Sequence, residues 1–458
     1  MTRDTYLVSK YNVPGPRYTS YPTVPYWDGN SFSANSWKAS IKEGLKIGEN
    51  GKPESISLYI HLPFCESMCT FCGCTKRITK NHLLEKPYIQ ALLKELQLYR
   101  DILDRKPTIQ QLHLGGGTPT FFSAENLEDL LIGIFKIADK APEAEFSFEG
   151  HPNNTTNAHL KMFNRIGFTR VCYGVQDYNE KVQQAINRIQ PFENVKAATV
   201  NAREAGYSSV GHDIIFGLPF QTEDDVANTV LQTIKLMPDR IAFYSYAHVP
   251  WIKGNGQRGY SEENLPSPEQ KRLQYKIGKK MLLQAGYVEI GMDHFALKTD
   301  ALYKAQQQGN IHRNFMGYTA SKTDVMIGLG VSAIGDSWYG FAQNVKTLKD
   351  YYELLRQNTL PVMRGHILNG EDLIVRKHIL NLMCNFETSW KDQSMQLYEM
   401  EDILAKLSEM QMDGLIEIGE NSLKITNSGK PYVRNVCLIF DLRLQRKKPE
   451  TKLFSMTV

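Results

Sequence analysis

Four cysteines fall within ten positions of this 458-residue chain, Cys65, Cys69, Cys72 and Cys74, separated by three, two and one residues. In a reducing compartment, clustered thiols serve more often as metal ligands or redox centres than as disulfides. A zinc site would normally show a second, separated pair of Cys or His ligands, and no such pair appears. Three thiolates from one tight loop favour an iron–sulfur cluster, and a cluster that Cys74 does not join keeps one iron open to a small molecule. The other cysteines stand alone in apolar runs and are expected in the core: Cys172, Cys384 and Cys437.

The same loop carries a motif that points to a known superfamily. The pattern C-x3-C-x2-C, with the aromatic residue Phe71 directly before the third cysteine, is the signature of radical S-adenosylmethionine enzymes. Over nearly its whole length the chain resembles the oxygen-independent coproporphyrinogen III oxidase family. The resemblance rests on the stretches "PGPRYTSYPT" (14–23), "YIHLPFCESMCTFCGC" (59–74), "LHLGGGTPT" (112–120), "YGVQDYN" (173–179), "DIIFGLP" (213–219), "YAHVP" (246–250), "GMDHFA" (291–296) and "HRNFMGYT" (312–319).

The resemblance implies the cofactors and the residues that would hold them. A 4Fe-4S cluster would be bound by Cys65, Cys69 and Cys72, next to one or two molecules of S-adenosylmethionine. Catalytic roles are implied for Tyr59, His61, Glu149 and Phe315. Cofactor contacts are implied for Tyr59, Phe71, Gly116, Gly117, Thr118, Glu149, Gln176, Arg188, Asp213, Ala247 and Ile334. Independently of the resemblance, alternation along an expected strand at 57–62 places Tyr59 and His61 on the same face.

The implied activity is the oxidative decarboxylation of two propionates of coproporphyrinogen III to vinyl groups, which gives protoporphyrinogen IX in anaerobic haem biosynthesis. An electron from the cluster would cleave S-adenosylmethionine to a 5'-deoxyadenosyl radical, which would take a hydrogen from a propionate side chain. A low-potential protein such as flavodoxin or ferredoxin would donate that electron. Because four propionates make the substrate a tetra-anion, cationic side chains should orient it, and we expect Arg17, Lys76, Arg77 and Arg313 to do so.

Two positions depart from the family pattern. Met316 stands where the family has a glutamine, and Gly150-His151 stands where it has an apolar–acidic pair. The missing amide at position 316 bears on the identity of the substrate more than on the radical chemistry. The alternatives are a haem chaperone, a radical enzyme that opens haem, and a structural cluster protein without turnover. Chaperone relatives usually lack the leader at 14–23 and the fourth cysteine, and this chain has both.

The elements that must position these residues recur with a regular order. Short β-rich runs, each followed by a helical pattern, lie at 55–63, 109–117, 144–150, 170–177, 209–217 and 240–248. Six such units predict a parallel sheet, in which functional residues gather at the carboxyl ends of the strands. The cysteine loop, the glycines at 115–117, Glu149, Gln176 and Asp213 all lie at or near such ends. The fold class is therefore α/β, and the resemblance implies an incomplete (β/α)6 barrel of the radical S-adenosylmethionine type.

The pattern changes after about residue 370 to helices with a short hairpin, which is typical of a winged helix. We expect an N-terminal extension over the active site at 1–50 and a barrel domain with a substrate-site extension at 51–365. A smaller, mainly helical, winged-helix-like domain is expected at 366–458. The basic residues of this last part are scattered, so DNA binding is not expected.

Composition narrows the partners and the compartment. A net charge of +4 over 458 residues is too weak to indicate nucleic acid binding. No segment approaches the ~20 apolar residues that a membrane helix needs, and the N-terminal sequence has no apolar run typical of a secretory signal. We therefore expect a cytoplasmic monomer that has no membrane span and binds no nucleic acid.

Overall fold

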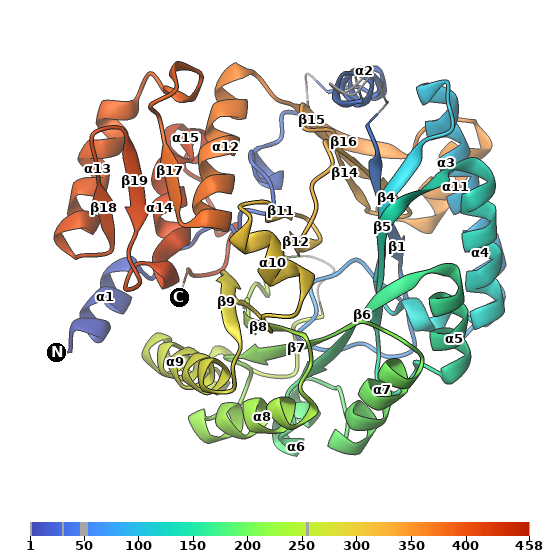
Figure 1. The fold of residues 1–458 in the computed structure, drawn as a ribbon, viewed down its shortest axis with the longest axis horizontal. Helices are drawn as coiled ribbons and strands as arrows, with labels where there is room; N and C mark the ends of the chain where they lie inside the picture. The colour runs from blue at the N-terminus through green and yellow to red at the C-terminus, as the bar shows by residue number, and fades with distance from the viewer. Residues whose placement is uncertain (1, 30–31, 46–53, 253–255, 458) are drawn as a thin grey trace.

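The structure is a computed structural model that describes residues 2–29, 32–45, 54–252 and 256–457 (Figure 1). Within these residues the main sheet has twelve strands, in the order β16-β15-β14-β13-β1-β4-β5-β6-β7-β8-β10-β9. Its central strands run parallel: β1 (Ile56–Leu62), β4 (Thr108–Gly116), β5 (Asp139–Gly150), β6 (Phe168–Gln176), β7 (Ser209–Phe216) and β8 (Arg240–Ser245). Each predicted β-rich run overlaps one of these strands, so the α/β class and the barrel-type sheet are confirmed.

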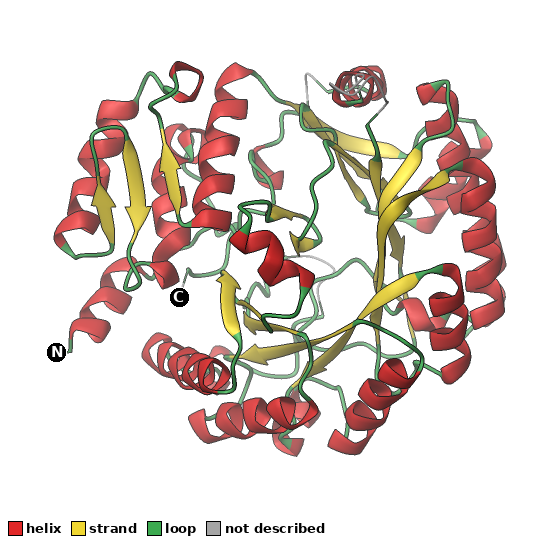
Figure 2. Cartoon of the chain, in the orientation of Figure 1, coloured by secondary structure: helices red, strands yellow, loops and turns green. Residues whose placement is uncertain are grey.

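Helices cover the outer, convex face of the sheet, whereas the inner face is left open toward the centre of the molecule (Figure 2). The outer helices are α3 (Glu85–Leu103), α4 (Ala124–Ile137), α5 (Asn157–Ile166), α6 (Glu180–Ala185), α7 (Phe192–Glu204), α8 (Glu223–Leu236) and α9 (Pro268–Gln284). Helix α8 begins with a capping box, in which the side chains of Thr222 and Asp225 bond each other's backbone N–H. Aromatic rings fill the layer between sheet and helices, for example Phe148 of β5 and Phe163 of α5, with ring centres 4.3 Å apart.

The sheet continues past the barrel strands at both edges. On one side β13 (Val325–Leu329) runs parallel to β1 and is followed by antiparallel β14 (Ile334–Asp336), β15 (Gly340–Asn344) and β16 (Val362–Ile367). On the other side β10 (His294–Ala296) and β9 (Val288–Gly291) pair antiparallel with β8 and with each other. The short pair β11 (His312–Asn314) and β12 (Gly317–Thr319) lies separately, and α10 (Ala301–Gln307) and α11 (Leu348–Arg356) connect these strands.

The C-terminal region has its own hydrophobic core and a three-stranded antiparallel sheet. Its elements are α12 (Gly370–Asn385), β17 (Glu387–Ser389), α13 (Met400–Met412), β18 (Ile416–Ile418), β19 (Ser422–Ile425), α14 (Val433–Phe440) and α15 (Leu442–Arg446). The expected helical C-terminal region is confirmed, whereas its winged-helix-like character stays a prediction. The proposed division at 365/366 falls inside β16, which pairs with β15, so we propose to draw this boundary after Ile367.

The N-terminal region contributes to two different parts of the molecule. Helix α1 (Arg3–Tyr11) packs under the C-terminal helices, where Leu7 and Tyr11 join their core (Figure 1). Helix α2 (Ala34–Gly44) instead packs on β15 and β16, and its Trp37 is buried in the core of the barrel. The proposed boundary at 50/51 lies outside the described residues. The two helices pack elsewhere and are not part of an extension over the active site. Only the segment between them is still proposed to cover the active site.

Candidate active site

The cysteine loop leaves the carboxyl end of β1 and returns along a short two-stranded sheet. Strand β2 (Phe64–Cys65) pairs in parallel with β3 (Arg77–Ile78). The side chains of Cys65, Cys69 and Cys72 line one cavity of about 260 Å³. Among the described residues, no three His, Cys, Asp or Glu side chains converge on one point as ligands of a single ion. Three thiols around one cavity supply the soft ligands that an iron–sulfur cluster uses.

Hydrogen-bond donors and cations face these thiols. The Thr118 hydroxyl donates to Cys65 Sγ at 3.4 Å, and Arg188 Nη1 lies 3.8 Å from Cys69 Sγ. The Arg188 Nε is buried without a hydrogen-bond partner among the described groups. Donors aimed at sulfur stabilise thiolates, and an orphaned buried N–H indicates room for an anionic group. The residues of this cavity therefore fit a thiolate-ligated cluster.

The fourth cysteine, Cys74, lines a different cavity from the other three. Cys74 is exposed and lines a second cavity of about 370 Å³ on the inner side of the barrel. A hydrogen bond from the Cys74 thiol lowers the pKa of the Cys72 thiol, whereas burial raises the pKa of the Cys65 thiol to about 11. Because Cys74 lines the lumen cavity and its thiol contacts Cys72 as a hydrogen-bond donor, we propose that Cys74 supports a cluster ligand and is not one itself.

The second cavity, the lumen cavity, is lined by all four residues that were predicted to be catalytic. Tyr59 and His61 share one face of β1, as alternation predicted. The Tyr59 hydroxyl lies 3.1 Å from His61 Nδ1, and His61 Nε2 lies 2.8 Å from the Thr75 carbonyl. Because only Nε2–H can donate to that carbonyl, Nδ1 accepts from Tyr59. Burial lowers the pKa of His61, so the ring is neutral at pH 7.

Glu149 ends β5 as an ionised carboxylate in the same cavity. Burial by itself would raise the pKa of Glu149, but the hydrogen bond and charge of His113 and the Gly116 N–H, which donates at 3.1 Å, hold that pKa below its usual value. Phe315 and Ile334 come from distant parts of the chain to the same walls, beside Arg17 and Arg313. The full lining is Arg17, Thr19, Tyr59, His61, Cys74, Thr75, His113, Gly116, Glu149, Tyr244, His294, Arg313, Phe315, Met316, Gly317, Ser332, Ala333 and Ile334.

The triple glycine has a packing explanation in the structure. Gly116 has φ +114°, and a Cβ there would lie 2.7 Å from the His61 ring, while a Cβ on Gly117 would meet the Pro63 backbone at 2.7 Å. The glycines are thus required where β4 passes closely beside the end of β1. A role in cofactor contact for Gly116, Gly117 and Thr118 is an additional proposal, which their position on the two cavity walls supports.

The remaining predicted cofactor contacts are placed as follows. Phe71 lines the cluster cavity, and the Gln257 side-chain amide bonds the carbonyls of both Phe71 and Ala247. The Gln176 amide lies beside Arg188 above Gly174. Burial raises the pKa of the Asp213 carboxyl to about 7. Gln176, Asp213 and Ala247 line neither of the two cavities, and their contact with a cofactor stays a prediction.

The expected substrate cations separate into three environments. Arg17 and Arg313 line the lumen cavity, and Lys76 lines the cluster cavity. Arg77 is exposed on β3 and lines neither cavity, because the parallel pairing of β3 with β2 turns it to the outside. The expectation that Arg77 orients the substrate is therefore withdrawn. His151 lines the cluster cavity and not the lumen cavity.

Sequence reasoning overlooked His113 in the lumen and a contact of Cys172 outside the lumen lining. His113 stacks on Tyr59 with ring centres 6.1 Å apart and contacts Glu149 at 3.6 Å. The pattern signal was available, since alternation along β4 places His113 on the face of Gly115. Cys172 was expected in the core, but its thiol donates to Asp213 Oδ1 at 3.2 Å. No pattern in the sequence signals this contact, because it joins two separate strands.

Comparisons with known proteins agree with this geometry. Residues 59–232 match the model of the radical SAM superfamily. An oxygen-independent coproporphyrinogen III oxidase of Escherichia coli is 38% identical over 99% of this chain and 98% of its own length. The enzyme of the same name from Synechocystis is 36% identical, over 99% and 97%. The solved structure of coproporphyrinogen III oxidase from Escherichia coli, described as a radical SAM enzyme, superimposes with a TM-score of 0.86 at 35% identity, over 93% of this chain and 97% of that one.

Proposed function

Because this chain belongs to the oxygen-independent coproporphyrinogen III oxidase family, we infer that it oxidatively decarboxylates two propionates of coproporphyrinogen III to vinyl groups. The product is protoporphyrinogen IX. The observation that carries this inference is similarity over nearly the full length of both chains, which includes the lumen-forming segments outside the superfamily match at 59–232. This full-length similarity favours the oxidase over the haem chaperone and the haem-opening enzyme.

The cofactors are a 4Fe-4S cluster and S-adenosylmethionine. When bound, they supply the 5'-deoxyadenosyl radical that removes a hydrogen from the substrate. We propose that Cys65, Cys69 and Cys72 hold the cluster, supported by the shared cavity and its donors. One or two molecules of S-adenosylmethionine would lie against the predicted contact residues, where the ionised Glu149 suits a cationic cofactor.

Cationic and neutral side chains of the lumen would position the substrate. Arg313 and Arg17 present guanidinium groups to the cavity, and an arginine paired with a propionate keeps that carboxyl ionised, which loss of CO2 requires. Neutral His61 and its hydrogen-bonded Tyr59 line the same cavity without adding charge. Phe315 and Ile334 exclude water from the reacting side chain.

Partners and compartment are proposed on chemical grounds. Among the described helices, none is long and apolar enough to cross a membrane. All seven cysteines are free thiols, which supports a reducing compartment such as the cytoplasm. We propose a monomer that receives its electron from flavodoxin or ferredoxin.

The test is an anaerobic reaction of the reconstituted protein with coproporphyrinogen III, dithionite and S-adenosylmethionine, followed by chromatography of the porphyrins. We expect one-vinyl and then two-vinyl products, and no product from Cys69→Ser. Cleavage of S-adenosylmethionine without vinyl formation would assign the chain another substrate. Haem binding without cofactor cleavage would favour the chaperone.

A further inference from the structure

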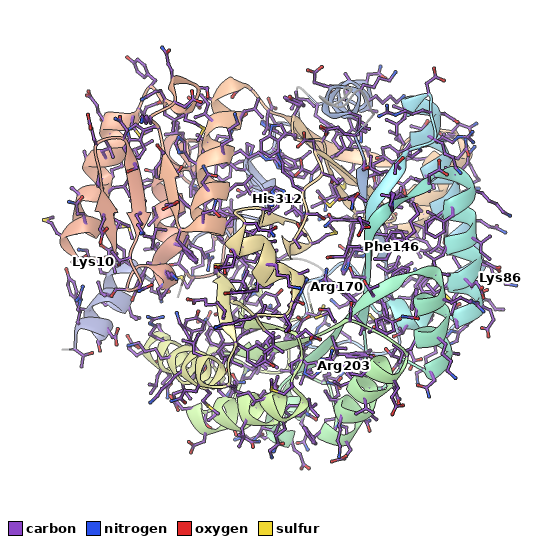
Figure 3. All side chains as sticks on the ribbon, viewed as in Figure 1. Lys10, Lys86, Phe146, Arg170, Arg203 and His312 are labelled. Atoms are coloured by element: carbon purple, nitrogen blue, oxygen red, sulfur yellow. The ribbon has the colours of Figure 1, made fainter. Side chains whose placement is uncertain are left out.

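The segment at 76–86, directly after the cysteine loop, forms a basic surface, here called the basic segment. It comprises β3, the short helix η2 (His82–Leu84) and the first turn of α3. Its cations are Lys76, Arg77, Lys80 and Lys86, and its one carboxylate, Glu85, is buried. Lys86 lies at the outer edge of the molecule (Figure 3). The surface is therefore positive where a partner could reach it.

The basic segment lies directly against the cluster cavity. Cys65 faces Ile78 in the β2–β3 pairing, and the Thr79 N–H donates to the Cys65 carbonyl at 2.9 Å. Lys76 lines the cavity, and its ammonium donates to the carbonyls of Cys72 and Cys74 at 3.2 and 3.3 Å. One strand thus connects the proposed first ligand of the cluster to the protein surface.

The charges of this surface are not neutralised by the protein. Arg77, Lys80 and Lys86 are exposed, and no carboxylate of the described residues forms an ion pair with any of them. Glu85 cannot do so, because it accepts hydrogen bonds from the Ser123 N–H and the Asn126 amide and contacts His82 at 2.7 Å. Unpaired like charges on one surface create a field that attracts an oppositely charged partner.

An exposed apolar side chain belongs to the same segment as these cations. Leu83 is 84% exposed. Its N–H donates to the Asn81 side chain at 3.1 Å, and the neighbouring His82 ring stacks on Phe121 with ring centres 4.5 Å apart. A large apolar side chain that the local backbone presents to solvent among polar residues suits contact with the apolar surface of a partner.

We propose that the basic segment is the docking surface for an acidic electron-donor protein. This inference rests on the proposed function, because the radical reaction consumes an electron that must come from outside the chain. The cations would orient the donor by charge, Leu83 would contact its apolar surface, and the electron would pass to the cluster beside Cys65. The donor class is a small acidic protein with a one-electron flavin or iron–sulfur centre.

The test compares the rate of cluster reduction by reduced flavodoxin and by reduced ferredoxin, two acidic probes, in anaerobic stopped-flow experiments. The double variant Lys80→Glu/Lys86→Glu should be reduced at least about tenfold more slowly at low salt, and the difference should shrink at high salt. Leu83→Ser should also slow reduction, but equally at both salt concentrations. Neither variant removes a contact that the folded chain needs, and dithionite should reduce both at the wild-type rate.

The control is Lys298→Glu/Lys304→Glu, which changes the net charge equally. Lys298 and Lys304 are exposed and follow β10, whose Ala296 pairs with Arg240 at the amino end of β8, opposite to the cluster loop. This control should accept electrons like the wild type. Wild-type rates for Lys80→Glu/Lys86→Glu, or no reduction of the wild type by either probe, would overturn the docking proposal. Vinyl formation driven by dithionite tests the proposed function separately.

Discussion

The substitution Arg313→Met should strongly lower kcat/KM for vinyl formation and leave the free energy of unfolding nearly unchanged. Arg313 is 5% exposed on β11; its Nη2 donates to the Arg17 carbonyl at 3.3 Å, and its guanidinium lies 4.6 Å from the centre of the Tyr318 ring. Its Nε and Nη1 are buried without a hydrogen-bond partner among the described groups. A buried guanidinium with two unused donors beside a cavity is expected where an anionic ligand completes the site.

The expected change in the free energy of unfolding is small. Methionine removes one hydrogen bond, about 1 kcal/mol, and a cation–π contact with Tyr318, about 1–2 kcal/mol. It also removes two buried, unpaired N–H groups, each of which costs about 1–3 kcal/mol. We therefore expect Arg313→Met to be as stable as the wild type or slightly more stable.

The expected loss of activity is large. A charge-assisted pair between guanidinium and propionate contributes about 1.5–3 kcal/mol, which corresponds to a fall of about 10- to 150-fold in kcat/KM for vinyl formation. The assays are chromatography of the porphyrins and unfolding in denaturant. Arg100→Met, the same change at an exposed position of α3, is the control and should alter neither quantity. A variant that loses several kcal/mol of stability, or one that keeps full kcat/KM, would refute the reasoning.

Three further predictions follow from the site and its supports. The proposed cluster ligands are Cys65, Cys69 and Cys72. Replacing any one of them by serine should abolish the broad visible absorption of the cluster, whereas Cys74→Ser should keep this absorption. Met316→Gln should change vinyl formation by less than about tenfold, because one hydrogen bond contributes roughly 1 kcal/mol; a larger gain would indicate a different natural substrate. Burial alone would raise the pKa of Asp372, but bonds from Arg443 and His366 lower it to about 2. That depressed pKa contributes about 2 kcal/mol of stability above pH 4, which is lost as pH falls toward 2. Asp372→Asn should show this loss already at pH 7 in denaturant unfolding, with a flatter acid dependence.

Local patterns in the sequence were sufficient for the elements and for the cluster loop. The β-rich runs became the parallel strands, since a strand buried on both faces needs a continuous apolar stretch. Alternation placed Tyr59 and His61 on one face of β1 because side chains of a strand point to opposite sides in turn. The spacing of Cys65, Cys69 and Cys72 brought them to one cavity, because all three belong to one short loop.

The tertiary structure decided every feature that depends on distant segments. Phe315 and Ile334 reach Tyr59 only because β13 pairs with β1 and brings the later part of the chain to the lumen. The same packing separates Arg313, which faces the lumen, from Arg77, which faces solvent. Cys74, only two residues beyond Cys72, lines the other cavity because the loop turns between them. Residue types and their spacing therefore determined which chemistry the chain can perform, whereas long-range strand pairing determined which side chains meet, because no local pattern records a contact between residues far apart in the chain.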